Sequence, residues 1–462
     1  MNFTAQDVES MIAMQRRFYF TGETRSAAFR IAMLSKLKEA IMSNEKEISE
    51  ALHKDLRKSP FESYVTEIGF VLTSISHMIK NLEQWMESEV VKTPVHLQPA
   101  KSFIVREPYG SALIIGPFNY PFQLVMEPLV GAIAGGNCAI VKPSEASVYT
   151  GEIIKKILTD IFPSEFVRVV EGEQQETSAL IHASFDYIFF TGSVAVGKVV
   201  MKAAAERLTP ITLELGGKSP ALVDQTADIV MAAERIVWGK FVNNGQTCVA
   251  PDYVIVHHTV KNQLVQAMGA TIRKFYGKVA AESLDYGRIV NDKHFNRLLK
   301  ILEKDRAHVV YGGDFNREDL FIEPTLLDNV KWNSASMEDE IFGPILPILT
   351  YDNLGEALHR IRQLPKPLAA YMFTENEQAS EYFIDNLPFG GGCINDTIAH
   401  VGNGNLPFGG VGSSGLNAYH GKYSFETFTH AKAMMKKSTT IPMKIAFPPY
   451  GQKLKLVKPL IR

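Results

Sequence analysis

A cysteine and a glutamate give the first indication of chemistry in this chain. Cys248 follows the segment Asn-Asn-Gly-Gln-Thr, and Glu214 lies 34 residues upstream, between Leu213 and Leu215. A thiolate can attack a carbonyl carbon. A carboxylate between apolar neighbours is partly desolvated, which raises its pKa toward the useful range for a general base. The pair predicts a covalent mechanism in which the thiol forms a thioester and the carboxylate activates water.

These residues also have structural interpretations. A free cysteine is commonly a small buried hydrophobic residue, and we expect that role for Cys138 and Cys393, which lie in apolar, strand-like segments. Cys248 differs because side-chain amides and a glycine precede it. An unperturbed thiol with a pKa near ~8.5 is mostly protonated at neutral pH, so some group must favour the thiolate. For Glu214 the alternative is a buried ion pair with Lys218.

A third candidate is Asn119, in the proline-flanked turn Gly-Pro-Phe-Asn-Tyr-Pro that follows an expected strand. Its side-chain amide can donate a hydrogen bond to a developing oxyanion, together with the backbone amide of Cys248. An ordinary turn asparagine is the alternative.

Two further segments have the residue types of a dinucleotide site. Gly192 and Gly197 lie where the expected strand Tyr187–Phe190 gives way to a helix, and helix N-terminal amides there can meet a phosphate. Their spacing is Gly-x4-Gly rather than G-x-G-x-x-G, so a strand–helix turn without a ligand is the alternative. Lys142 and Glu145 follow another expected strand and can bracket ribose hydroxyls, or else belong to an exposed capping turn.

Short apolar strands alternate with helices from residue 110 onward, and these elements must position the candidate residues. This order is typical of a parallel sheet with right-handed crossovers. The expected strands are Ala112–Ile115, Ala139–Val141, Val167–Val170 and Tyr187–Phe190. The expected helices are Phe122–Ala134, Val148–Ile161 and Val194–Arg207.

A second alternating series predicts a second sheet domain, with a cleft between the two. It begins at Ile211–Leu215 and Ala221–Val223 and continues through Tyr253–Val256 to about Phe389. The helix Ile229–Phe241 precedes the loop of Cys248.

Other parts of the chain have different patterns. The first 90 residues are expected to be helical, and the segment 94–108 suggests a hairpin or an extended arm. The lysine-rich segment 452–458 is expected to be a solvated tail or an oligomer edge rather than a membrane anchor. One face of the N-terminal helices carries Leu34, Leu37, Ile41, Ile48 and Leu52.

Composition excludes several classes of protein. The 462 residues carry 48 basic and 50 acidic side chains, so no basic excess indicates a nucleic-acid partner. The three cysteines are widely spaced without metal-ligand spacing, which argues against a disulfide framework and a metal site. The first residues lack the pattern of a signal peptide, and the apolar stretch Leu129–Val141 is too short and too interrupted to span a bilayer. We therefore expect a soluble cytoplasmic protein.

Taken in order, the motifs resemble those of the aldehyde dehydrogenase superfamily, and in detail its class 3 branch, over roughly residues 20 to 435. Beyond the segments above, the resemblance is carried by Glu340-Ile341-Phe342-Gly343-Pro344, by Leu406-Pro407-Phe408-Gly409-Gly410-Val411-Gly412 and by Tyr419-His420-Gly421-Lys422. It implies an α/β fold with a Rossmann-like cofactor domain, an α/β catalytic domain and a small β bridging arm used in oligomerisation.

The resemblance also implies domain boundaries. The cofactor-binding domain would comprise residues 1–90 and 107–210, and the bridging arm residues 91–106 and 427–445. The catalytic domain would comprise residues 211–390, followed by a return segment near the active site at 391–426 and a C-terminal tail at 446–462.

The resemblance assigns roles to individual residues. Cys248 would be the nucleophile, Glu214 the base for deacylation and Asn119 the oxyanion donor, with no metal. The aldehyde would be oxidised to the carboxylic acid through a thiohemiacetal and a thioester on Cys248. The residues implied to bind the cofactor are Lys142, Glu145, Gly192, Ser193, Gly197, Leu215, Glu340 and Phe342.

The implied cofactor is NAD or NADP, and the implied partners are a small aldehyde and a second copy of the chain in a homodimer. Two other enzymes remain open. A CoA-acylating aldehyde dehydrogenase would pass the acyl group to coenzyme A, although Glu214 as a water-activating base argues against it. A cysteine hydrolase would pair its thiol with a histidine, for which His400 and His420 are the nearest candidates.

Overall fold

The computed structural model describes residues 4–440 and 447–459. The first alternating series forms a six-stranded sheet with the order β17-β7-β6-β3-β4-β5, in which only β17 is antiparallel to its neighbour. The strands are β3 (Ser111–Ile115), β4 (Cys138–Lys142), β5 (Val167–Val169), β6 (Tyr187–Thr191), β7 (Ile211–Glu214) and β17 (Gly415–Leu416).

Helices cover both faces of this sheet. Ala112 and Ile114 of β3 belong to a core with α2, α5, α6 and α7, whereas Leu113 and Ile115 belong to a core with α1, α8 and α9. Successive side chains of a strand point to opposite faces, so a strand covered on both sides is a continuous apolar run. The helices are α1 (Ala5–Phe20), α2 (Ala27–Ser43), α3 (Glu45–Leu56), α4 (Pro60–Ser63), α5 (Gly69–Met86), α6 (Gln123–Gly135), α7 (Val148–Ile161), α8 (Gln174–Ile181) and α9 (Val194–Arg207).

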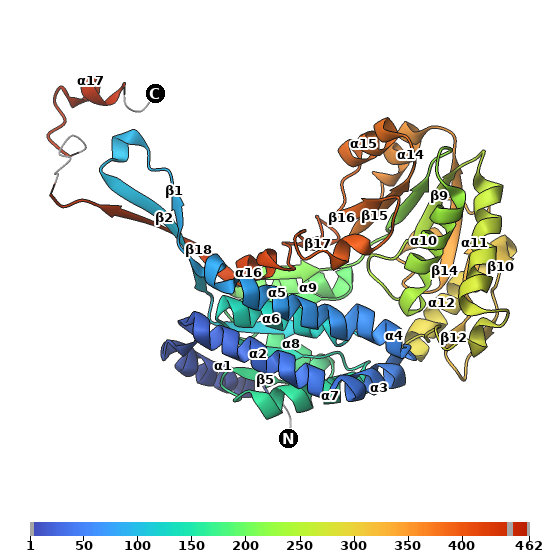
Figure 1. The fold of residues 1–462 in the computed structure, drawn as a ribbon, viewed down its shortest axis with the longest axis horizontal. Helices are drawn as coiled ribbons and strands as arrows, with labels where there is room; N and C mark the ends of the chain where they lie inside the picture. The colour runs from blue at the N-terminus through green and yellow to red at the C-terminus, as the bar shows by residue number, and fades with distance from the viewer. Residues whose placement is uncertain (1–3, 441–446, 460–462) are drawn as a thin grey trace.

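The second series forms a seven-stranded sheet in a separate lobe (Figure 1), with the order β10-β13-β14-β9-β8-β15-β16. Its strands are β8 (Pro220–Val223), β9 (Tyr253–His257), β10 (Val309–Tyr311), β13 (Thr325–Leu327), β14 (Ile345–Tyr351), β15 (Ala369–Phe373) and β16 (Gly391–Ile394). Its helices are α10 (Ile229–Phe241), α11 (Lys261–Tyr276), α12 (Asp292–Lys304), α13 (Ala335–Glu338), α14 (Leu354–Ile361) and α15 (Glu377–Asn386). The predicted α/β architecture with two sheets is confirmed.

The division between the sheets differs from the sequence-based prediction at two strands. Ile211–Glu214 was expected to open the second series, but β7 pairs with β6, Ile188 opposite Ile211, and so belongs to the first sheet. At the other end, β16 pairs with β15 and carries the second sheet beyond residue 390. Alternation along the chain reveals the strands but not their neighbours, because pairing is a tertiary contact. One consequence is that Glu214 ends a strand of the first sheet, at the crossing into the second.

A three-stranded antiparallel arm projects from the body (Figure 1). It consists of β1 (Glu89–Val91), β2 (Ala100–Pro108) and β18 (Thr429–Lys437), with β2 in the centre. The hairpin expected near 94–108 therefore has a third strand from the far end of the chain. Residues 441–445 of the expected arm, and residues 446 and 460–462 of the expected tail, lie outside the described residues, as do residues 1–3.

Beyond the arm, the described part of the tail carries the short exposed helix α17 (Lys453–Val457). Within the residues described, no helix combines the length and the apolar character needed to cross a membrane.

Asn137 joins the arm to the first sheet. It follows Gly136, which ends α6 with a φ of 86°, a conformation that glycine adopts without strain. The Asn137 side chain accepts a hydrogen bond from the Gly110 amide at 3.0 Å and donates one to the Phe428 carbonyl at 2.8 Å, directly before β18. This one buried amide therefore connects the start of β3, the end of α6 and the base of the arm.

We expect Asn137→Ala to lower the free energy of unfolding by about 3 kcal/mol. Each buried backbone group left without a partner costs about 1–3 kcal/mol, and the substitution leaves both Gly110 and Phe428 unsatisfied. Urea unfolding followed by circular dichroism measures the effect. Asn386→Ala, which removes a bond within the exposed end of α15, is the control. Equal destabilisation by the two substitutions would contradict the role given to Asn137.

Candidate active site

A cavity of about 490 Å³ is lined by residues of both lobes. Ten of the eleven residues singled out in the sequence lie in its wall, namely Asn119, Lys142, Glu145, Gly192, Ser193, Glu214, Leu215, Cys248, Glu340 and Phe342. Gly197 is the exception. It lies behind the wall, where a Cβ atom would come within 2.6 Å of a Leu215 methyl group.

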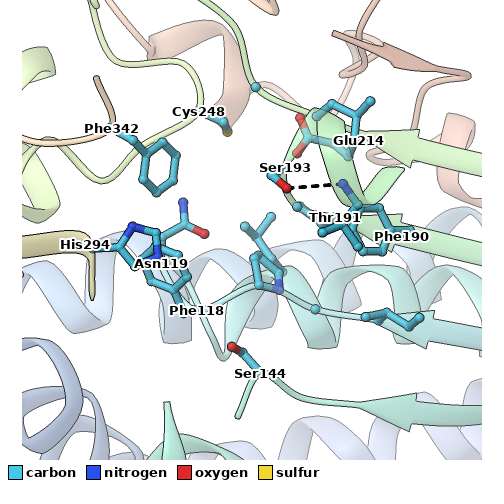
Figure 2. Close-up of a pocket in the computed structure, with 18 of the residues that line it drawn as sticks. Phe118, Asn119, Ser144, Phe190, Thr191, Ser193, Glu214, Cys248, His294 and Phe342 are labelled. Carbon is cyan, nitrogen blue, oxygen red and sulfur yellow. Dashed lines mark hydrogen bonds between the residues drawn. The ribbon is translucent and has the colours of Figure 1, made fainter. Parts of the chain in front are cut away.

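Figure 2 shows that the side chains of Cys248, Glu214 and Asn119 point toward the same open space. Cys248 lies in a turn after α10, Glu214 at the end of β7, and Asn119 between β3 and α6. The sheets thus bring together a thiol, a carboxylate and an amide that are up to 129 residues apart in the sequence.

The amide-rich segment before Cys248 has a structural purpose. Asn243, Asn244 and Gly245 all have positive φ values, of 51°, 57° and 75°. Asparagine and glycine are the residues that adopt this conformation most readily. The side-chain amides of Asn243 and Gln246 then donate to the carbonyls of Asn119 and Arg288, at 2.7 and 3.0 Å. These residues hold the strained turn that presents Cys248 to the cavity.

Glu214 is buried, and neither of its carboxylate oxygens has a hydrogen-bond partner. The alternative interpretation, an ion pair with Lys218, is wrong. Lys218 pairs with Asp252 at 2.5 Å and donates to the carbonyls of Ser336 and Asp339. Burial, together with the nearby charge of Glu340, raises the pKa of Glu214 well above its usual range. A raised pKa makes the ionised carboxylate a stronger proton acceptor than an ordinary glutamate.

Asn119 is a buried asparagine in a crowded set of hydrogen bonds. Its side-chain nitrogen donates to the Gln246 carbonyl at 2.9 Å, and its own carbonyl accepts from Lys58 at 3.0 Å. These contacts orient the amide toward the wall that carries Cys248. An amide nitrogen has two N–H groups, so one remains to serve a ligand oxygen.

The rest of the cavity has the features of a dinucleotide site. Lys142, the last residue of β4, forms an ion pair with Glu145 at 2.5 Å. Ser193 caps α9 by accepting a hydrogen bond from Val196, drawn as the dashed line in Figure 2. Gly216 passes so close to Glu340 that a Cβ atom would lie 2.2 Å from its carboxylate. The start of α9 suits a phosphate, and the paired charges of Lys142 and Glu145 suit ribose hydroxyls. Gly216, which has no side chain, leaves room for a ring to lie close to the backbone. These groups together fit a nicotinamide dinucleotide.

A comparison with known proteins decides the family. The aldehyde dehydrogenase family model matches residues 1–434. The chain belongs to the aldehyde dehydrogenase family. It is an oxidoreductase that oxidises an aldehyde to a carboxylic acid with NAD or NADP, and the predicted resemblance is confirmed.

Its relatives include members of class 3. The chain is 52% identical to 4,4'-diaponeurosporen-aldehyde dehydrogenase of Staphylococcus aureus, over 98% of each chain. It is 44% identical to aldehyde dehydrogenase family 3 member H1 of Arabidopsis thaliana, over 99% of this chain and 96% of the relative. A dimeric NADP-preferring aldehyde dehydrogenase of Mus musculus is 43% identical over 94% of this chain and 95% of the relative. Among solved structures, a substrate-bound Staphylococcus aureus AldH superposes with a TM-score of 0.97, at 51% identity, with full coverage of both chains.

Three residues that line the cavity of this aldehyde dehydrogenase were not predicted from the sequence, because they belong to none of the motifs. Lys293, His294 and Arg297 come from α12 of the second lobe. The His294 ring lies 4.7 Å from Phe118, and burial lowers its pKa to about 4, so the imidazole is neutral. Only the packing of α12 against the first lobe brings these residues to the site, and no local pattern marks them.

The histidines considered for a hydrolase lie elsewhere. His400 Nδ1 is 3.6 Å from the sulfur of Cys393, not that of Cys248. His420 is stacked on Phe408 and lines a second cavity.

Around Cys248 the electrostatics disfavour the free thiolate. Burial raises the pKa of the Cys248 thiol well above its ordinary value, and the charges of Glu214 and Glu340 raise it further. Desolvation also raises the pKa of the partly buried Glu340, to about 8. These effects favour the thiol form of Cys248 over the thiolate.

A buried ion pair supports the catalytic turn. The side chains of Lys58 and Glu67 are fully buried and bonded to one another. Glu67 also accepts hydrogen bonds from the amides of Phe122 and Gln123, at 2.9 and 3.1 Å, where α6 begins. Lys58 reaches the Asn119 carbonyl, so the pair holds both sides of the turn that presents Asn119.

We expect Lys58→Met to destabilise the enzyme by about 3–5 kcal/mol, because it leaves the Glu67 charge buried without its partner. Thermal unfolding measures this loss. Surviving folded enzyme should also lose turnover, since the Asn119 carbonyl loses its anchor. Lys46→Met is the control, because the Lys46 side chain is 91% exposed. A Lys58→Met enzyme as stable as this control would show that the pair does not hold the turn.

Proposed function

We propose that the enzyme oxidises its aldehyde through covalent intermediates on Cys248, and that water activated by Glu214 releases the acid. The observation that carries this proposal is the convergence of the Cys248 thiol, the unpartnered Glu214 carboxylate and the Asn119 amide on one cavity. The cysteine hydrolase has less support, because the nearest histidine candidates lie by Cys393 and in a second cavity.

In the first step the Cys248 thiol loses its proton to solvent, and the thiolate sulfur adds to the carbonyl carbon, which opens the C=O double bond and gives the ionised thiohemiacetal. The carbonyl oxygen becomes an oxyanion, which accepts hydrogen bonds from the Asn119 side chain and the Cys248 backbone amide. Donors aimed at an oxyanion in a site that excludes water contribute about 100- to 1,000-fold in rate each. Loss of a hydride from the tetrahedral carbon then leaves a thioester on Cys248.

The thioester is released by hydrolysis. Glu214 takes a proton from a water molecule, and the resulting hydroxide attacks the acyl carbon and expels the Cys248 thiolate. The raised pKa of Glu214 and its free oxygens suit it to this exchange.

Residues of both lobes would hold the cofactor. Lys142 and Glu145 would contact the adenosine ribose, and Gly192 and Ser193 the diphosphate at the start of α9. When bound, an oxidised nicotinamide ring supplies the hydride acceptor and a positive charge. Glu340 would hold the ribose at the catalytic end, and Phe342 would pack beside the ring; Leu215, which also lines the cavity, would contact the cofactor. Gly197 would act indirectly, by allowing α9 to approach Leu215.

We also propose a homodimer assembled through the arm. The mouse relative is named as dimeric. In the arm β1 and β18 are both edge strands, and Met434 and Met435 of β18 are 43% and 45% exposed. Unpaired strand edges with exposed apolar side chains favour pairing with another chain.

Cys248→Ala should abolish cofactor reduction, with a loss on the order of 10⁴-fold or more, because among the described residues that line the cavity Cys248 is the one thiol that can form the thioester. The measurement is absorbance of the reduced cofactor with a panel of aldehydes and with NAD or NADP. Cys393→Ala is the matched control and should keep activity. Comparable turnover in the Cys248→Ala enzyme would refute the covalent mechanism.

Glu214→Gln should leave an initial burst of reduced cofactor but slow steady turnover by about 10²–10⁴-fold, since acylation proceeds while water loses its base. Stopped-flow absorbance separates the burst from the steady rate, and mass spectrometry detects the acyl group on Cys248. Glu375→Gln, at an exposed position, is the control. Loss of the burst itself would argue against a role limited to deacylation, and acceleration of the wild type by coenzyme A would argue against water as the acceptor.

A further inference from the structure

A second cavity, of about 420 Å³, lies between α5 and the segment that leads into α16 (Lys422–Thr427). Aromatic side chains from Tyr64 and Phe70 line one part of it. Two buried polar side chains, Glu127 and His420, line another. Nothing in the proposed mechanism uses either of them.

Glu127 lines this cavity and has one carboxylate oxygen without a hydrogen-bond partner. The residue is 1% exposed, and one carboxylate oxygen accepts a hydrogen bond from Ser74 at 2.7 Å while the other has no partner. Burial raises the pKa of Glu127 to about 7, so the side chain is largely ionised at pH 8. Among the described residues that line this cavity, none is a lysine or an arginine. Glu127 therefore has no lysine or arginine beside it in the described lining of this cavity, where His77 is the other histidine besides His420.

His420 supplies a second acceptor. It is 2% exposed, and its Nε2 has no hydrogen-bond partner. A hydrogen bond to the Val401 backbone favours the protonated ring, but burial prevails and lowers the pKa of His420 to about 3, so the ring is neutral. A neutral imidazole that donates from one nitrogen to a backbone carbonyl leaves the other nitrogen as an acceptor. Stacking on Phe408, at 4.9 Å between ring centroids, holds the ring in place.

This cavity adjoins the catalytic one. Leu124 lines the first cavity and Glu127 the second, and both lie on α6. Residues three apart on a helix have Cβ atoms about 5–6 Å apart. Tyr419, directly before His420, lies within charge range of Glu214 and Cys248 as well as Glu127. A molecule held at Cys248 is therefore within reach of the second cavity.

We propose that the second cavity takes the far end of the aldehyde substrate and that Glu127 selects substrates whose far end carries an ammonium group. This inference rests on the proposed function. The Glu127 carboxylate and the His420 ring are both hydrogen-bond acceptors, so they are complementary to a ligand group that donates hydrogen bonds. The negative charge of Glu127 favours a donor that is positively charged. The faces of Tyr64 and Phe70 attract cations as well. A purely apolar chain would instead leave Glu127 and His420 buried without partners.

The test compares two aldehydes of the same shape. In 4-(dimethylaminomethyl)benzaldehyde the far end is a protonated tertiary amine with one N–H donor, and in 4-isobutylbenzaldehyde a C–H group replaces it. The readout is the ratio of kcat/KM for the amine to kcat/KM for the hydrocarbon at pH 8. Glu127→Gln keeps the shape and the acceptor for Ser74, so this variant tests the charge with little disturbance of packing. Glu152→Gln, at an exposed position of α7, is the matched control.

We expect the wild type and the Glu152→Gln control to favour the amine, and Glu127→Gln to reduce the ratio about 10- to 100-fold, the range for loss of a charge-assisted hydrogen bond. Thermal unfolding of each variant shows that it is folded. An unchanged ratio in Glu127→Gln, or a wild type that prefers the hydrocarbon, overturns the assignment of Glu127. If the wild type oxidises neither aldehyde nor any other member of an aldehyde panel, the proposed function fails instead.

Discussion

The buried ion pair between Lys58 and Glu67 connects three segments on which the site depends. Glu67 binds the first amides of α6, and Lys58 binds the carbonyl of Asn119, which also accepts from Asn243 in the turn before Cys248. A charge in a fully buried position is tolerated only with its partner and its hydrogen bonds in place. The oxyanion donor and the nucleophile are therefore positioned by one set of buried polar contacts, and neither turn can move without the other.

Several acidic side chains lie close together in the cavity, where little water is present to screen their charges. Glu214 is buried, and Glu340 and Cys248 are partly buried. Glu340 raises the pKa of Glu214, and both carboxylates raise the pKa of Cys248. Like charges in a poorly solvated space hold protons that they would release in water. The acidic groups therefore favour a cationic ring in the cavity, and the raised pKa of Glu214 makes its ionised form a stronger base.

Local patterns predicted most elements closely. The helices Val148–Ile161, Val194–Arg207 and Ile229–Phe241 have the bounds expected from the sequence, because each ends where apolar periodicity meets a cap or a turn. The sequence was a poorer guide to which strands pair with one another in a sheet. Ile211–Glu214 has the same apolar pattern whichever sheet it joins, and only its pairing with β6 assigns it to the first.

The sequence by itself determined which groups can react, because thiol, carboxylate and amide chemistry belongs to the residue type and the ordered motifs mark their positions. Tertiary structure alone decided that Glu214 has free oxygens while Lys218 pairs with Asp252, that α12 supplies His294, and that Glu127 faces a second cavity. Those properties depend on burial and on contacts between distant segments. Desolvation and pairing act through space, so no local pattern of residues can encode them.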